Sequence, residues 1–209
     1  DAQSREAEER LAGQSAAKER NAKAPCQEER WFWNSFSNLP KISHNANIYL
    51  RQDDIPNFLH FFFGHAIMMM GSNGRLWEHA HPDVYVPCEN PDNGTAAWFA
   101  ENFRNMLLTE DKGVLWLMKG TPRAWLLHGK SISVAHAPTW YGELNYAVTS
   151  YADDGMIHAE IQVPGRLIPP VMKLRLRHPH GERIRSVMCN GAHYSDIDPD
   201  GETITFKAP

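Results

Sequence analysis

The sequence has little cysteine: three residues in 209, at Cys26, Cys88 and Cys189. Their wide spacing predicts neither a disulfide framework nor a CxxC metal site. No apolar run reaches the ~18 residues that a membrane-spanning helix needs, so no membrane span is expected. Lysine and arginine total 21 against 25 aspartate and glutamate, a net charge of -4. This composition gives no electrostatic support for a nucleic-acid partner.

Several signatures of catalysis and cofactor binding are also missing. There is no glycine-rich phosphate loop, no dinucleotide fingerprint and no GxSxG nucleophile elbow, which sets those enzyme classes aside. We expect no bound cofactor. The hydrophobic content of 42%, with 11% aromatic residues, is typical of a folded chain rather than a disordered one. A soluble protein is expected; its compartment is left open, and secretion or a periplasmic location is compatible with the sequence.

Residues 1–46 differ in composition from the rest of the chain. The first 24 are rich in alanine, glutamate, lysine and arginine, and Leu11 is their only large aliphatic residue. A helix without an apolar stripe has no face to pack, so a charged helical extension or linker is favoured over a partner-binding helix. Four aromatic residues then cluster between Trp31 and Phe36, and their apolar surface requires a hydrophobic contact.

Residues 47–113 carry apolar residues at helical spacing. An acidic cap at residues 53–54, followed by a proline in the first turn, predicts a helix that ends near Met70. This helix is apolar on all sides, which predicts packing on more than one side, as for an inner helix of a layered array. A second, amphipathic helix is predicted from about Thr95 to residues 111–113. The two helices form a hairpin.

From residue 114 onwards the apolar period changes from 3.6 to 2. At residues 156–163, isoleucine, alanine and valine alternate with histidine, glutamate and glutamine, and similar short runs recur between proline and glycine turns. Such strands predict an antiparallel β-sandwich for residues 114–209. A helical part followed by a β part defines the α+β class, with two domains meeting near residue 113.

Short motifs of this chain resemble one region of the large (α/α)-toroid carbohydrate-active enzymes of the six-hairpin type. The motifs similar to the last helical hairpin and its junction with a β-sandwich lie at residues 47–54, 97–107, 115–117, 120–125 (GTPRAW) and 129–132. The motifs similar to strands of that sandwich lie at residues 137–142 (APTWYG), 174–177 and 187–191. The resemblance covers about residues 47–207. It implies an enzyme that cleaves glycosidic bonds in a polysaccharide or oligosaccharide, with glycoside hydrolysis favoured over a lyase reaction.

The chain departs from that family in its number of helices. A complete toroid needs about a dozen helices, which at ~11–12 residues each would nearly consume this chain. Only two long helices are predicted here. We therefore expect an incomplete toroid that is completed by residues N-terminal to this chain or by another chain. A free hairpin that is apolar on opposite sides would expose a large patch, which favours such a partner surface.

The candidate site is the connection between the two helices, residues 71–94, because long irregular loops in compact domains are often functional. Glycoside hydrolysis usually needs two carboxyl groups that flank the bond. Glu78 is the candidate acid/base, and His79 is its proton-transfer or substrate-orienting partner. The candidate residues for binding the carbohydrate substrate are Trp77, His81, Tyr85 and Glu89. The alternative is that all of these are ordinary loop residues that cap helix ends.

The histidines of this chain can also be interpreted as metal ligands or as core residues. The His-x-His pair at residues 79–81, with Cys88 and Glu89 nearby, has side chains that bind zinc. An incidental arrangement is favoured, because a zinc site needs four ligands placed by the fold, and no metal is expected. His60 and His65 lie on the apolar helix and are expected to be core histidines with hydrogen-bonded partners.

The last candidate site is a cluster of basic residues. A basic stripe on one sheet face would suit an anionic polysaccharide, and its members are Lys173, Arg175, Arg177, Arg183 and Arg185. A solvated face balanced by nearby acids is favoured, given the net charge. The alternative to an enzyme is a non-catalytic module that binds sugar or serves a structural or interaction role.

Overall fold

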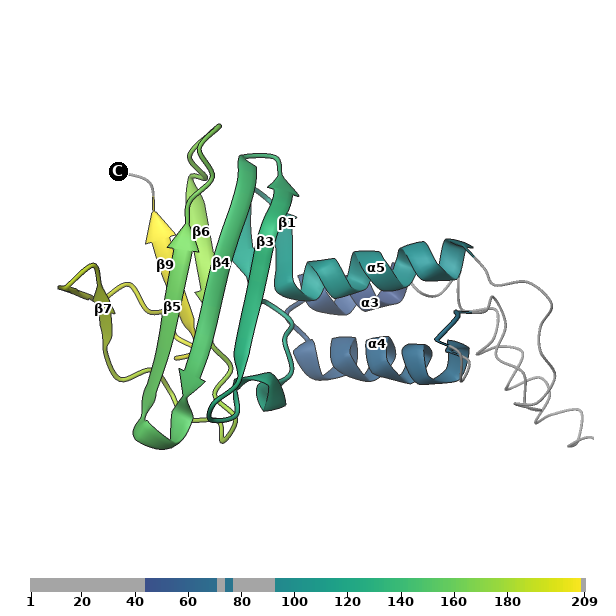
Figure 1. Cartoon of the computed structure of the whole chain (residues 1–209), viewed down its shortest axis with the longest axis horizontal. Helices are drawn as coiled ribbons and strands as arrows, with labels where there is room; N and C mark the ends of the chain where they lie inside the picture. The colour runs from purple at the N-terminus through teal and green to yellow at the C-terminus, as the bar shows by residue number, and fades with distance from the viewer. Residues whose placement is uncertain (1–43, 71–73, 77–92, 208–209) are drawn as a thin grey trace, which may run out of the picture.

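The computed structural model describes residues 44–70, 74–76 and 93–207. Figure 1 shows helices on one side of a layered pair of β-sheets, so the predicted α+β class is confirmed. The described helices are α3 (His44–Arg51), α4 (Ile55–Met69) and α5 (Asn93–Leu107). None of these helices is both long enough and apolar enough to cross a membrane.

The turn between α3 and α4 fixes the start of α4 where the sequence predicted it. The Asp54 side chain caps α4 by accepting a hydrogen bond from the backbone N–H of Asn57 at 3.3 Å. The same turn ends α3 in a Schellman arrangement, because Asp54 N–H donates to the Tyr49 carbonyl and Asp53 N–H to the Leu50 carbonyl. Asp53 adopts the left-handed conformation (φ 65°) that this arrangement requires. The turn thus satisfies backbone groups of both helices.

Helix α4 has two apolar faces. The first is buried against α3 and α5 in a core cluster whose members include Phe58, Phe62 and Trp98. The second leaves Phe63 and Ile67 exposed, and 78% of the surface of Ile67 is accessible. Packing on more than one side was predicted for this helix. Within the described part of the chain it is packed on one side and open on the other.

Helix α5 is shorter than predicted, and its end passes directly into a strand. The helix ends at Leu107, and β1 (Leu108–Asp111) replaces the expected last helical turn. β1 pairs antiparallel with β2 (Val114–Leu117) across Lys112 and Gly113, which both adopt the positive φ of a two-residue hairpin turn (50° and 81°). The prediction of a helix up to residues 111–113 is therefore wrong, because strand pairing overrides the local helical pattern.

β1 and β2 belong to a four-stranded sheet with the order β1-β2-β6-β9, completed by β6 (Val171–Arg175) and β9 (Thr203–Lys207). β2 and β6 run parallel, whereas β1 with β2 and β6 with β9 run antiparallel. The sheet is mixed, which corrects the prediction of a purely antiparallel sandwich. Parallel neighbours need a long crossover connection, and here that connection contains the whole second sheet.

The second sheet is an antiparallel meander of β3 (Ser131–Thr139), β4 (Gly142–Tyr151) and β5 (Met156–Gln162). Its inner residues Leu144 and Val148 share one core cluster with Leu115 and Leu117 of the first sheet, so the two sheets pack face to face as in a sandwich. The remaining elements are η1 (Arg123–Leu126), η2 (Ala152–Asp154) and the hairpin of β7 (Val187–Cys189) and β8 (Ala192–Tyr194).

The sheets hold the C-terminal end of α5. The Leu107 carbonyl accepts hydrogen bonds from Met118 N–H at 2.7 Å and from the Tyr146 hydroxyl at 2.9 Å. The Met106 carbonyl accepts one from Gly120 N–H at 3.1 Å. The last carbonyls of a helix have no partner within the helix itself. The segment after β2 and a side chain of β4 supply those partners, which joins the helices to the sandwich.

His65 is buried beside α5, whereas His60 on the same helix is exposed. The prediction that both are core histidines is therefore wrong for His60. The ring centroid of His65 lies 4.0 Å from that of Trp98, and its Nε2 has no hydrogen-bond partner among the described residues. Burial lowers the pKa of His65 to about 4.

Replacing Gly120 with alanine is expected to destabilise the contact between helices and sheets. A Cβ at this position would lie 2.8 Å from the Phe58 ring and 2.9 Å from the Leu50 side chain, and both neighbours are buried. We expect the free energy of unfolding in urea to fall by about 1–3 kcal/mol, the usual cost of overpacking. Gly165→Ala is the matched control, because a Cβ there meets nothing within 4 Å. Equal losses in both variants would contradict this account.

Lowering the pH is expected to destabilise the fold through His65. The unfolded chain takes up this proton near pH 6.5 and the folded chain only near pH 4, so the free energy of unfolding falls as the pH drops through this window. The full shift corresponds to about 3 kcal/mol. Urea denaturation across this range should show a smaller pH dependence for His65→Leu, with His60→Leu as the exposed control. The same pH dependence in both variants and in the unaltered chain would rule His65 out.

Candidate functional site

The site residues predicted from the sequence all lie outside the described part of the chain. They are Trp77, Glu78, His79, His81, Tyr85 and Glu89. On one side of them, Met70 and Leu76 form an isolated antiparallel bridge, and on the other side α5 begins at Asn93. The roles assigned to these six residues therefore stay predictions.

A charged hollow of about 380 Å³ lies where the end of α3 meets the four-stranded sheet. We call it the junction hollow. Its lining contains four lysine or arginine side chains and four aspartates, arranged around Trp116. A smaller hollow of about 50 Å³ adjoins it, and the two share Arg51, Asp111 and Lys119. Opposite charges held side by side around an aromatic ring make this the candidate binding site of the described chain.

Strand register explains why polar groups gather there. Thr109 is paired with Trp116, Trp116 with Lys173, and Lys173 with Thr205. This row therefore crosses all four strands on the face opposite the core, and Arg175 follows on the same face two residues beyond Lys173. The sequence predicted the strand at residues 114–118 but not its surface residue. The alternation of Trp116 with buried leucines on either side could have identified it.

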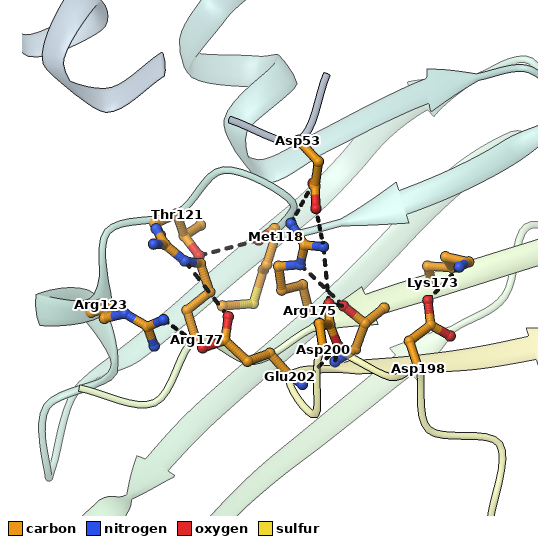
Figure 2. Close-up of polar contacts among 11 residues, drawn as sticks. Asp53, Met118, Thr121, Arg123, Lys173, Arg175, Arg177, Asp198, Asp200 and Glu202 are labelled. Carbon is orange, nitrogen blue, oxygen red and sulfur yellow. Dashed lines mark hydrogen bonds and ion pairs between the residues drawn. The ribbon is translucent and has the colours of Figure 1, made fainter. Parts of the chain in front are cut away.

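Arg175 is the most extensively bonded residue of this face. It is 5% exposed, and its two terminal nitrogens donate to the carboxylate oxygens of Asp53 at 2.6 and 2.8 Å (Figure 2). It also donates to Asp200 at 3.1 Å and to the Thr203 hydroxyl at 3.0 Å. Burial alone would lower the pKa of Arg175, but the hydrogen bonds and charges of Asp53 and Asp200 raise it. The guanidinium is thus fixed and remains charged.

The neighbouring cations of the predicted basic stripe are also neutralised. Lys173 is paired with Asp198, and Arg177 donates to the Thr121 carbonyl at 2.9 Å and lies 3.9 Å from Glu202 (Figure 2). Burial lowers the pKa of Arg177, with Glu202 acting in the opposite direction. The expected balance by nearby acids is confirmed for Lys173, Arg175 and Arg177. The expected solvation is wrong for Arg175 and Arg177, which are buried, whereas Arg183 and Arg185 are exposed.

Lys119 differs from these residues because it has no carboxylate partner. It is 4% exposed, and its ammonium group lies 4.7 Å from the ring centroid of Trp116. Its side chain forms no hydrogen bond or ion pair with any other residue that the structure describes. Burial lowers the pKa of Lys119, and the charges of Asp53 and Asp111 partly oppose this. A desolvated cation over an indole ring gains about 2 kcal/mol, which offsets part of the cost of burial.

Trp116 is surrounded by cations. Besides Lys119, the ammonium group of Lys173 lies 5.1 Å from its ring centroid and the guanidinium carbon of Arg175 lies at 5.3 Å. The indole ring therefore holds positive groups together on the sheet face. Its role in the junction hollow is to position these groups.

In the ranges that the structure describes, no group of three or more His, Cys, Asp or Glu side chains is placed to hold a metal ion. The predicted His-x-His pair at residues 79–81, with Cys88 and Glu89, lies outside those ranges. That zinc alternative therefore stays untested by geometry.

Replacing Asp53 with asparagine removes the ion pair with Arg175 but keeps the turn between α3 and α4. Asparagine tolerates the left-handed conformation, so the turn is kept while Arg175 loses its closest charged partner. We expect the free energy of unfolding to fall by about 1–3 kcal/mol, measured by urea denaturation. Asp154→Asn, at an exposed position of η2, is the matched control, with an expected change below about 0.5 kcal/mol. Unchanged stability of Asp53→Asn would mean that Asp200 alone compensates Arg175.

Comparison of the chain with models of protein families, with curated proteins and with solved structures finds no match. No family is therefore assigned to it by similarity.

Proposed function

We propose that this chain is part of a carbohydrate-active enzyme that hydrolyses glycosidic bonds in a polysaccharide or oligosaccharide. In this proposal α4 and α5 are the last hairpin of an (α/α) toroid, and the sheets after them are its C-terminal β-sandwich. The missing hairpins come from residues N-terminal to this chain or from another chain. The resemblance of the sequence motifs is the origin of the proposal.

The observation that carries the proposal is the second apolar face of α4. Phe63 and Ile67 are exposed on a helix whose opposite face is already buried in the helical core, and Met70, the residue directly after the helix, is exposed as well. Phe63 and Ile67 lie one helical turn apart on this face, and an apolar face of this kind is where a further helix would pack. A further helix packed on this face would give α4 the two packed sides of a helix inside a toroid.

The order of the elements also supports the proposal. Helix α5 leads into β1 without an intervening loop, and its last carbonyls are bonded by the segment after β2. The helical pair and the sandwich therefore meet in a fixed orientation. A cleft formed by the toroid would then keep a constant position relative to the sheets, as catalysis between several elements requires.

The proposed chemistry uses the loop of residues 71–94 as one wall of the cleft. Glu78 acts as the acid that protonates the leaving glycosidic oxygen, and His79 orients the substrate or relays the proton. Trp77 and Tyr85 stack on sugar rings, while His81 and Glu89 bind hydroxyl groups. The second carboxyl group that hydrolysis needs comes from the helices that complete the toroid.

The test is hydrolysis by the complete particle that contains this chain. We expect the particle to be heavier than the chain alone and to release new reducing ends from an oligosaccharide panel. Glu78→Gln should lower turnover by about 10²–10⁴-fold, the contribution of general acid–base catalysis. Glu160→Gln is the matched control, because Glu160 is exposed on β5 in the sandwich.

Three results would change the proposal. Unchanged turnover of Glu78→Gln would remove Glu78 from the mechanism. Products with an unsaturated ring would indicate a lyase in place of a hydrolase. A particle of the mass of this chain that binds oligosaccharides without cleaving them would identify the alternative, a non-catalytic sugar-binding module.

A further inference from the structure

The backbone that carries Lys119 is held rigidly where the two hollows meet. Met118 on one side has a positive φ of 57°, and its N–H donates to the Leu107 carbonyl at 2.7 Å. Gly120 on the other side donates to the Met106 carbonyl at 3.1 Å. Lys119 is thus fixed between two anchored neighbours and lines both hollows. Holding the backbone on both sides of Lys119 restricts the positions that its side chain can take, which preorganises it for a ligand.

The charges of the junction hollow divide into paired and unpaired groups. Asp53 and Asp200 are both used by Arg175, and Asp198 is used by Lys173. Among the described residues, this leaves the cations of Arg51, Lys112 and Lys119 without an ion pair, against the single unpaired carboxylate of Asp111. The unpaired groups therefore carry an excess of positive charge, although the lining as a whole is balanced.

We propose that the junction hollow binds a small hydroxylated carboxylate, such as a sugar acid, with the carboxylate group at Lys119 and Arg51. A carboxylate would give Lys119 the charge-assisted hydrogen bond that the described residues do not provide. A hydroxyl group of the ligand would donate to the carboxylate of Asp111, which has no donor among the described residues. The volume of about 380 Å³ is within the usual range of small-molecule sites.

The same lining disfavours a phosphate group. Of the four aspartates that border the hollow, Asp53, Asp198 and Asp200 are neutralised by ion pairs. The free carboxylate of Asp111 remains, and a like charge at short range repels a dianion more strongly than a monoanion. An anion without a hydroxyl group would also leave the carboxylate of Asp111 without a donor. The geometry therefore favours a ligand that carries one negative charge and a hydroxyl donor for Asp111.

This inference goes beyond the proposed function and does not depend on it. None of the residues involved belongs to the loop of residues 71–94, and binding can be measured without turnover. Absence of hydrolysis would leave the binding measurement unaffected, and absence of binding would leave the hydrolysis measurement unaffected. The two proposals can therefore fail separately.

The test is an NMR titration of the full chain with D-glucuronate, D-glucose, acetate and inorganic phosphate, observing the indole N–H of Trp116. We expect D-glucuronate to bind more tightly than the other three probes. Lys119→Met keeps the aliphatic stem but removes the charge, and should weaken D-glucuronate about tenfold or more. Lys130→Met, at an exposed position outside the hollow, is the matched control and should bind as the unaltered chain does.

A second variant keeps the test decisive if Lys119→Met fails to fold. Arg51→Gln changes an exposed residue at the end of α3 that lines both hollows, and it should weaken D-glucuronate by about threefold or more. D-glucuronate binding no tighter than D-glucose or acetate would overturn the proposal. So would tighter binding of phosphate, or unchanged affinity in both Lys119→Met and Arg51→Gln.

Discussion

The guanidinium of Arg175 lies almost fully buried on the outer face of a sheet, where an unpaired cation would cost several kcal/mol. Its partners come from separate parts of the chain: Asp53 from the turn between α3 and α4, and Asp200 and Thr203 from the start of β9. Satisfying this one charge therefore fixes the helices against the sheet and fixes the approach of β9. The same contacts engage Asp53 and Asp200, so neither of these carboxylates pairs with Lys119.

The junction between helices and sheets contains no flexible linker. Helix α5 continues into β1, the carbonyls of Met106 and Leu107 are bonded by residues after β2, and Gly120 lets Phe58 pack directly on that segment. Domains joined by short, bonded and closely packed connections move together, in contrast to domains joined by exposed linkers. A site formed between the two parts thus keeps its geometry.

Structure that depends on neighbouring residues was predictable from the sequence, whereas pairing between distant segments was not. The acidic cap and the proline at the start of α4 are patterns of neighbouring residues, and so is the alternation of apolar and polar residues in β5. Both elements were therefore predicted. The end of α5 and the parallel pairing of β2 with β6 were missed, because both depend on which strand lies alongside. The exposure of His60 was missed because an all-apolar helix does not reveal which face is covered. The candidate loop was chosen from its length and composition, whereas the junction hollow is assembled from segments too far apart in sequence to form a motif.

The parallel pairing of β2 with β6 has a consequence for how the chain is synthesised. Val114 lies opposite Val171, so β2 emerges from the ribosome well before the strand that covers its edge. The β3-β4-β5 meander has mostly local contacts and can form in the interval, whereas pairing across a long loop is slow. Until β6 arrives, β2 has a free edge that can pair with a strand of another chain. Nascent chains of this protein are therefore most prone to aggregate in the interval between the synthesis of β2 and that of β6.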